Sequence, residues 1–165
     1  MIKHGKPGLD QQTSVATIEL PVPPVFSANR ENLNLKGSKQ DRVLAGYIAA
    51  LDALPGASAF VVCSILIDMA KISLTVAIAA ASNIARKDPD PDRTIGALNA
   101  LRHFDPGEAI KVTLERLLEP TLAAQAGRVL FDIDPVLALI EFKKLAGSDN
   151  DALCTTGKQL TELFA

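Results

Sequence analysis

Tryptophan is absent from this sequence, and aromatic residues make up only 4% of its 165 positions. Hydrophobic residues nevertheless reach 48%, so aliphatic side chains and alanine must fill the core. Long charge-free apolar runs are also lacking: residues 57–67 give 11 positions and residues 72–85 give 14. A membrane-spanning helix needs about 20 predominantly apolar residues. We therefore expect a soluble protein without stable insertion into a membrane.

Cysteine is sparse, with only Cys63 and Cys154. Each lies in an apolar helical context, where a cysteine acts first as a small buried hydrophobe. Two such residues do not suggest a disulfide framework and favour a reducing compartment. The N-terminal stretch MIKHGKPGLDQQTS has no apolar segment after its basic residues and does not resemble a secretory signal. The expected location is the cytoplasm.

A strong charge of either sign is lacking too, because 17 basic residues stand against 19 acidic ones and the net charge is −2. Such a balance gives no general attraction to nucleic acid. The sequence contains no GxGxxG after a strand, no P-loop, no GxSxG, no HExxH and no CxxC motif. We expect no cofactor and no metal, and an enzymatic function is not favoured.

Three alternating aspartates, Asp88, Asp90 and Asp92, have the spacing that opens an EF-hand calcium loop. The sixth loop position needs glycine and the twelfth needs glutamate, but these positions hold Arg93 and Asn99. The alternation with proline suits helix capping better, with Asp90 as the N-cap and a proline as the first helical residue. We therefore interpret these aspartates as a helix start.

The first 36 residues differ from the rest, since they hold four of the ten prolines. Proline disfavours helix and favours an extended polyproline conformation. We expect an extended or flexible N-terminal arm over residues 1–36. Pro21, Pro23 and Pro24 have PxxP spacing and form a candidate partner-binding segment within the arm.

From Ser38 onward the pattern is helical. Ser38 is the expected N-cap of a helix that ends at Pro55-Gly56. Further helices are expected to start at Asp90, Asp105 and Asp134, each followed by proline, and a last short helix near Gly157. His103 is expected to interact with a helix C-terminus and to bridge to Asp105. The starts at 90, 105 and 134 share no common period, so a solenoid is not predicted.

Residues from about 57 to 87 contain no glycine or proline and are apolar around most of a helical circumference. This predicts one long central helix buried on several sides. Its polar residues recur at steps of three and four and fall on one face. Four of them define the polar seam: Ser64, Asp68, Lys71 and Thr75. The seam either faces water or a neighbouring helix, or it lines a ligand-binding cavity.

The predicted fold is therefore an all-α domain over residues 37–165, a bundle of six or seven helices around this central helix. The favoured function is a non-enzymatic helical module for protein–protein interaction, assembly or regulation, with a protein partner or self-association. The alternative is a small-ligand-binding domain or small enzyme that uses the polar seam. A membrane-active bundle is disfavoured because charged residues lie near the middle of the central helix.

Overall fold

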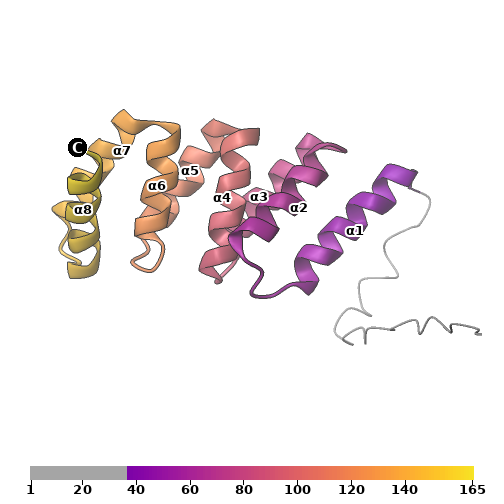
Figure 1. Cartoon of the computed structure of the whole chain (residues 1–165), viewed down its shortest axis with the longest axis horizontal. Coiled ribbons are helices and arrows are strands. Elements are labelled where there is room, and N and C mark those ends of the chain that lie inside the picture. Colours follow the sequence, from indigo (N-terminus) through magenta and orange to yellow (C-terminus); the bar gives the residue numbers. More distant parts are fainter. Residues whose placement is uncertain (1–36) are drawn as a thin grey trace, which may run out of the picture. The chain divides into compact units, whose positions relative to one another are not determined.

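The computed structural model describes residues 37–165, which lie within one compact unit. The predicted arm, with Pro21, Pro23 and Pro24, lies outside the described residues. All regular secondary structure in residues 37–165 is helical, which confirms the all-α prediction (Figure 1). The helices are α1 (Lys39–Ala53), α2 (Ala59–Ala70), α3 (Leu74–Lys87), α4 (Pro91–Phe104), α5 (Pro106–Leu117), α6 (Ala123–Ile133), α7 (Pro135–Ala146) and α8 (Asp151–Phe164). None of them is long and apolar enough to cross a membrane.

Short polar side chains start the helices where the sequence predicts. The Ser38 hydroxyl accepts a hydrogen bond from the backbone of Asp41, and the Asp41 carboxylate accepts one from the backbone of Ser38, which forms a capping box. Asp90, Asp105 and Asp134 cap α4, α5 and α7, and each is followed by proline at the first helical position. The repeated Asp-Pro is therefore a helix-start signal.

The prediction of one long helix over residues 57–87 is wrong. The chain leaves the helix after Ala70, and Ser73 takes an extended conformation whose hydroxyl accepts a hydrogen bond from the Val76 backbone at 3.4 Å. The segment therefore forms two helices, and residues 37–165 hold eight helices rather than six or seven. The physical reason is packing: the break lets α2 and α3 contact each other and both pack on α4, and one straight helix cannot pack against itself.

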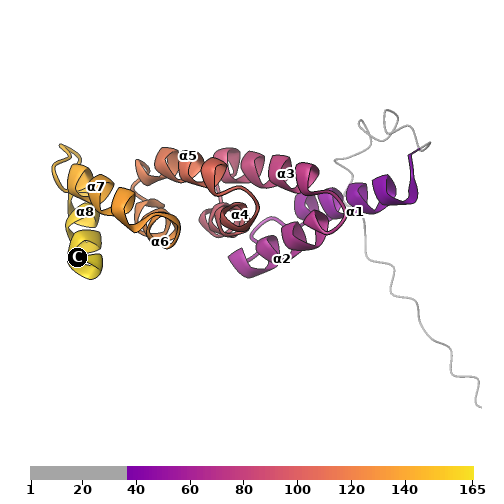
Figure 2. The same ribbon diagram turned by 90° about the horizontal axis from the view of Figure 1, so that it is seen from above.

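The helices do not surround a central one. Their main contacts join helices that are one or two apart in chain order. The pairs α2–α4, α4–α6 and α6–α8 form one layer, and α3 and α5 pack together in the other. Figure 2 shows α3 and α5 along one edge of this arrangement and α2, α4 and α6 along the other. Each helical hairpin therefore packs on its neighbours, as in an α-solenoid, and the predicted bundle around one helix is corrected.

Buried positions in α4, α6 and α8 recur at a spacing of 30 residues. The three recurring sets are Arg93, Ala123 and Leu153; Ala97, Gly127 and Gly157; and Ala100, Leu130 and Leu160. Comparing consecutive helix starts hides this spacing, because the repeating unit is a pair of helices. The residue types also differ within each set, so burial repeats although the sequence does not.

Candidate functional site

The polar seam is divided by the break between α2 and α3. Ser64 and Asp68 lie on α2, Lys71 follows its last residue, and Thr75 lies on α3. Lys71 Nζ donates to Asp68 Oδ1 at 2.6 Å in an exposed ion pair. The hydrogen bond to Asp68, together with its negative charge, raises the pKa of Lys71. The four residues do not share one helix, and their role as a ligand site stays a prediction.

The polar residues further along α3 pair with a neighbouring helix. Ser82 Oγ donates to Glu108 Oε1 on α5 at 3.0 Å, and Arg86 Nη1 donates to the same oxygen at 2.7 Å. Arg86 Nε also donates to Glu115 at 3.1 Å. The hydrogen bond from Arg86 is the main cause that lowers the pKa of Glu108, and the one from Ser82 adds to it. This cluster joins α3 to α5 by three hydrogen bonds.

Glu108→Gln should lower the free energy of unfolding at neutral pH, and the difference from the parent should shrink on acidification. The pKa of Glu108 is lower when folded than when unfolded. Its stabilising contribution is therefore complete above the ordinary pKa of a glutamate and is lost as the pH falls through the folded value. Urea midpoints measured from neutral to acidic pH test this. Exposed Glu162, replaced by glutamine, is the control and should leave the midpoint close to that of the parent. A Glu108→Gln difference that does not vary with pH would contradict the assignment.

A second polar cluster surrounds Asp88, where α3 ends. Arg93 Nε donates to the Asp88 carboxylate at 2.6 Å, and its Nη1 donates to the carbonyls of Leu51 and Leu54 at 2.8 and 2.6 Å. Arg116 Nη2 donates to the Asp88 carbonyl at 2.8 Å. Asp88 thus forms a largely buried ion pair with Arg93, while the second aspartate of the series caps α4. The carboxylates of Asp88 and Asp90 both have partners within the protein. For Asp90 this partner is the backbone of α4, as the interpretation of a helix start expects.

Cys63, Cys154 and His103 lie on three different helices of the described part of the chain. Burial raises the pKa of the half-buried Cys63 thiol, which disfavours the reactive thiolate. Cys154 Sγ donates to the Ala146 carbonyl at 3.0 Å. His103 is exposed in the last turn of α4, but the expected bridge to Asp105 is not formed, and the Asp105 carboxylate accepts from the Glu108 backbone.

The described surface includes the following two hollows. One, of about 490 Å³, lies where α4 ends, α5 begins and α6 ends. The other, of about 300 Å³, lies between α1 and α3 and is mostly apolar. Its lining residues are Ile48, Leu51, Asp52, Val76, Ala79, Ala80, Asn83 and Ile84. Neither hollow is lined by a residue of the polar seam.

The most exposed large apolar side chain of residues 37–165 is Phe60 on α2, at 79%. Val61 and Ile67 on the same helix are also exposed, and Ser64 between them is half-buried. We call these four residues the α2 face. The sequence did not reveal it, because an almost wholly apolar helix predicts burial on all sides. An exposed group of large apolar side chains marks an interaction surface in many soluble proteins.

Comparisons with known proteins yield no relative for this chain. No family model, no curated protein and no solved structure matches it.

Proposed function

We propose that this protein is a non-enzymatic helical assembly module in which two copies associate through the α2 face. The observation that carries the proposal is the exposure of Phe60 on α2, a helix made almost entirely of apolar residues. This helix is the first of the even-numbered layer. Stacked helical proteins need polar outer faces on their terminal helices to stay soluble. The first helix of the even-numbered layer keeps a phenylalanine and two aliphatic side chains exposed instead, which fits a surface that is covered in the assembled protein.

A second copy suits this face because the face is complementary to itself. A two-fold axis near Ser64 would place Val61 of one copy against Ile67 of the other, and the reverse pair would form at the same time. The small serine at the axis permits the two helices to approach closely. The same symmetry sets Phe60 against the end of the partner's α2. Two apolar pairs and two phenylalanine contacts would thus be buried around one axis.

The charges next to the α2 face support the same pairing. Asp68 and Lys71 form an ion pair whose charges sum to zero, so a second copy would bring no net like charge to the interface. Phe60 would cover the aliphatic stem of Lys71 and interact with its ammonium group. A contact made by one three-turn helix from each copy falls among small interfaces of less than about 1,200 Å². We therefore expect weak, reversible dimers.

Sedimentation velocity over a range of protein concentrations tests the proposal. The parent should shift from monomer to dimer as concentration rises, and Phe60→Glu should raise the dimer dissociation constant at least about tenfold. The substitution should not unfold the protein, because Phe60 is exposed and a glutamate in the first turn of a helix is favourable.

Val136→Glu is the matched control. Val136 is 71% exposed and is the second residue of α7, as Phe60 is the second residue of α2. This control should dimerise like the parent. A parent that remains monomeric at all concentrations, or equal weakening by both substitutions, would overturn association through the α2 face.

A further inference from the structure

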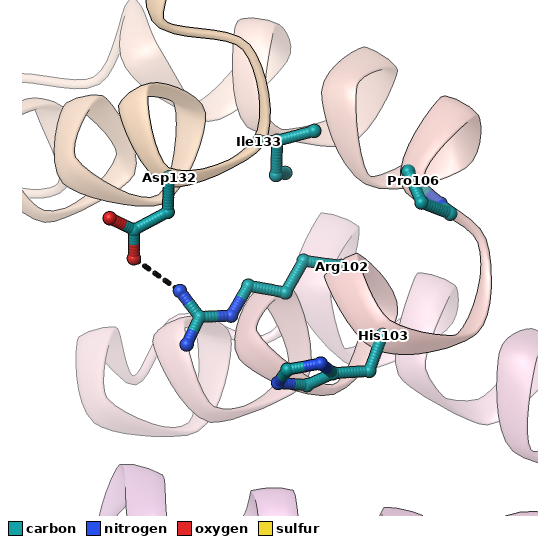
Figure 3. Close-up of a pocket in the computed structure, with 5 residues that line it drawn as sticks. All are labelled: Arg102, His103, Pro106, Asp132 and Ile133. Carbon is teal, nitrogen blue, oxygen red and sulfur yellow. Dashed lines mark hydrogen bonds and ion pairs between the residues drawn. The ribbon is translucent and has the colours of Figure 1, made fainter.

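The larger hollow lies at the junction of three helices. It has a volume of about 490 Å³ and is lined by Arg102, His103, Pro106, Asp132 and Ile133 (Figure 3). Arg102 and His103 come from the end of α4, Pro106 begins α5, and the other two come from the end of α6. The lining therefore combines an arginine and a histidine with two apolar side chains and one carboxylate.

Arg102 has unused hydrogen-bonding capacity. Its Nη1 donates to Asp132, but its buried Nε has no acceptor among residues 37–165. The other arginines that form ion pairs differ in this respect. Arg86 Nε donates to Glu115 at 3.1 Å, Arg93 Nε to Asp88 at 2.6 Å and Arg116 Nε to a carbonyl of α3 at 2.6 Å. A buried donor left without an acceptor is destabilising, and more so when it is charged. Arg102 therefore keeps a buried donor for which this part of the chain supplies no acceptor.

The position of the unused donor defines the missing group. The Nε–H of a guanidinium is parallel to one N–H of the adjacent terminal nitrogen, and these two donors match the two oxygens of a carboxylate. In Figure 3 this edge of Arg102 lies on the side of the His103 ring, away from the dashed line to Asp132. The exposed His103 ring can move aside and donate a further hydrogen bond.

The surrounding charges restrict the ligand further. The Asp132 carboxylate beside the guanidinium repels a doubly charged phosphate more than a singly charged carboxylate. Pro106 and Ile133 offer apolar contact to a short aliphatic group. We propose that this hollow binds a small aliphatic monocarboxylate, held by the Nε edge of Arg102 and by His103. This site is independent of the α2 face and of the self-association inferred above.

Titration of the full chain with sodium propionate, followed by NMR, tests the site directly. The Nε–H signal of Arg102 should shift and saturate, and the amide signal of Ile133 should follow with the same dissociation constant. Propionamide, which has the same shape without the charge, and sodium chloride at equal ionic strength should leave both signals unchanged. Inorganic phosphate should bind at least about tenfold more weakly than propionate.

Arg102→Lys keeps the positive charge but removes the paired donors. Monitored at Ile133, it should raise the dissociation constant for propionate at least about tenfold. Arg128→Lys, at an exposed arginine of α6, is the control and should leave the constant unchanged. An unmoved Arg102 signal, equal shifts with propionamide, tighter binding of phosphate, or unchanged affinity in Arg102→Lys would each overturn the proposal.

Discussion

Gly157→Ala should unfold or detach α8, and it is expected to have one of the largest effects of any single methyl group added to this protein. A Cβ at Gly157 would lie 2.7 Å from the Leu145 carbonyl carbon and closer still to the backbone nitrogen of Ala146. Both atoms belong to the backbone of α7, so no side-chain rotation can relieve the overlap. We expect a loss of about 3 kcal/mol or more in the free energy of unfolding, which corresponds to roughly 10 °C in Tm.

The measurement is thermal and urea unfolding, combined with hydrogen exchange of Asp151–Phe164. Gly46→Ala is the matched control, because Gly46 is also inside a helix but a Cβ there meets nothing within 4 Å. It should stabilise the protein by up to about 1 kcal/mol, through the higher helix propensity of alanine. Equal effects of the two substitutions would show that α7 and α8 are not packed backbone against backbone.

The same close approach explains why Gly157 could not be placed correctly from the sequence. A glycine within a helical pattern normally indicates a helix end, and the last helix was expected to be short and to start near this residue. In the structure α8 starts at Asp151, where Asn150 caps it, and Gly157 is a buried residue in its interior. Only the contact with another helix tells a packing glycine from a terminating one.

Local signals predicted well wherever a helix begins beside a short polar residue. The caps at Ser38, Asp90, Asp105 and Asp134 were all identified, because their chemistry involves atoms a few residues apart. The break at Ser73 was missed, although serine is also a good N-cap. Apolar residues on both sides of it continue the helical pattern, and the break depends on how α2 and α3 share α4.

The candidate sites were less predictable than the helices. Asp68 and Lys71 do pair, as their spacing indicates, but the α2 face could not be inferred, since exposure of Phe60 depends on what packs against α2. The Arg102 hollow joins residues about 30 positions apart and has no motif. The buried Arg93 and Arg116 were also not predicted, although the prolines that follow α1 and α3 indicate helix ends that lack a backbone donor.

Proline removes a backbone donor where α1 and α3 end. Within a continuing helix, the carbonyls of Leu51 and Ala85 would accept hydrogen bonds from residues 55 and 89, but both are prolines. Arg93 Nη1 donates to the Leu51 carbonyl at 2.8 Å, and Arg116 Nε donates to the Ala85 carbonyl at 2.6 Å. A buried arginine thus supplies the missing donor at both helix ends, and Arg93 also ties α1 to the start of α4.

Arg93→Met should therefore both destabilise the domain and loosen α1. The Arg93 residue is 7% exposed, and removing it leaves the Leu51 carbonyl without its side-chain donor and the Asp88 carboxylate without its positive partner, with the Asp90 backbone N–H as its remaining donor. Breaking one partner of a buried ion pair costs about 3–5 kcal/mol. Arg93→Lys should recover only part of this, since one ammonium cannot reproduce the arrangement of the guanidinium donors.

Urea midpoints and hydrogen exchange distinguish a local effect of Arg93→Met from a global one. Protection in Lys39–Ala53 should fall more than protection in α7 and α8, because α1 otherwise buries fully only Leu44 and Leu51. Arg42→Met, at an exposed arginine of α1, is the control and should change stability by no more than about 0.5 kcal/mol. If Arg93→Met were as mild as this control, or if α1 kept its protection, the donor lost at Pro55 would not be supplied by Arg93. The attachment of α1 would then depend on its two buried leucines alone.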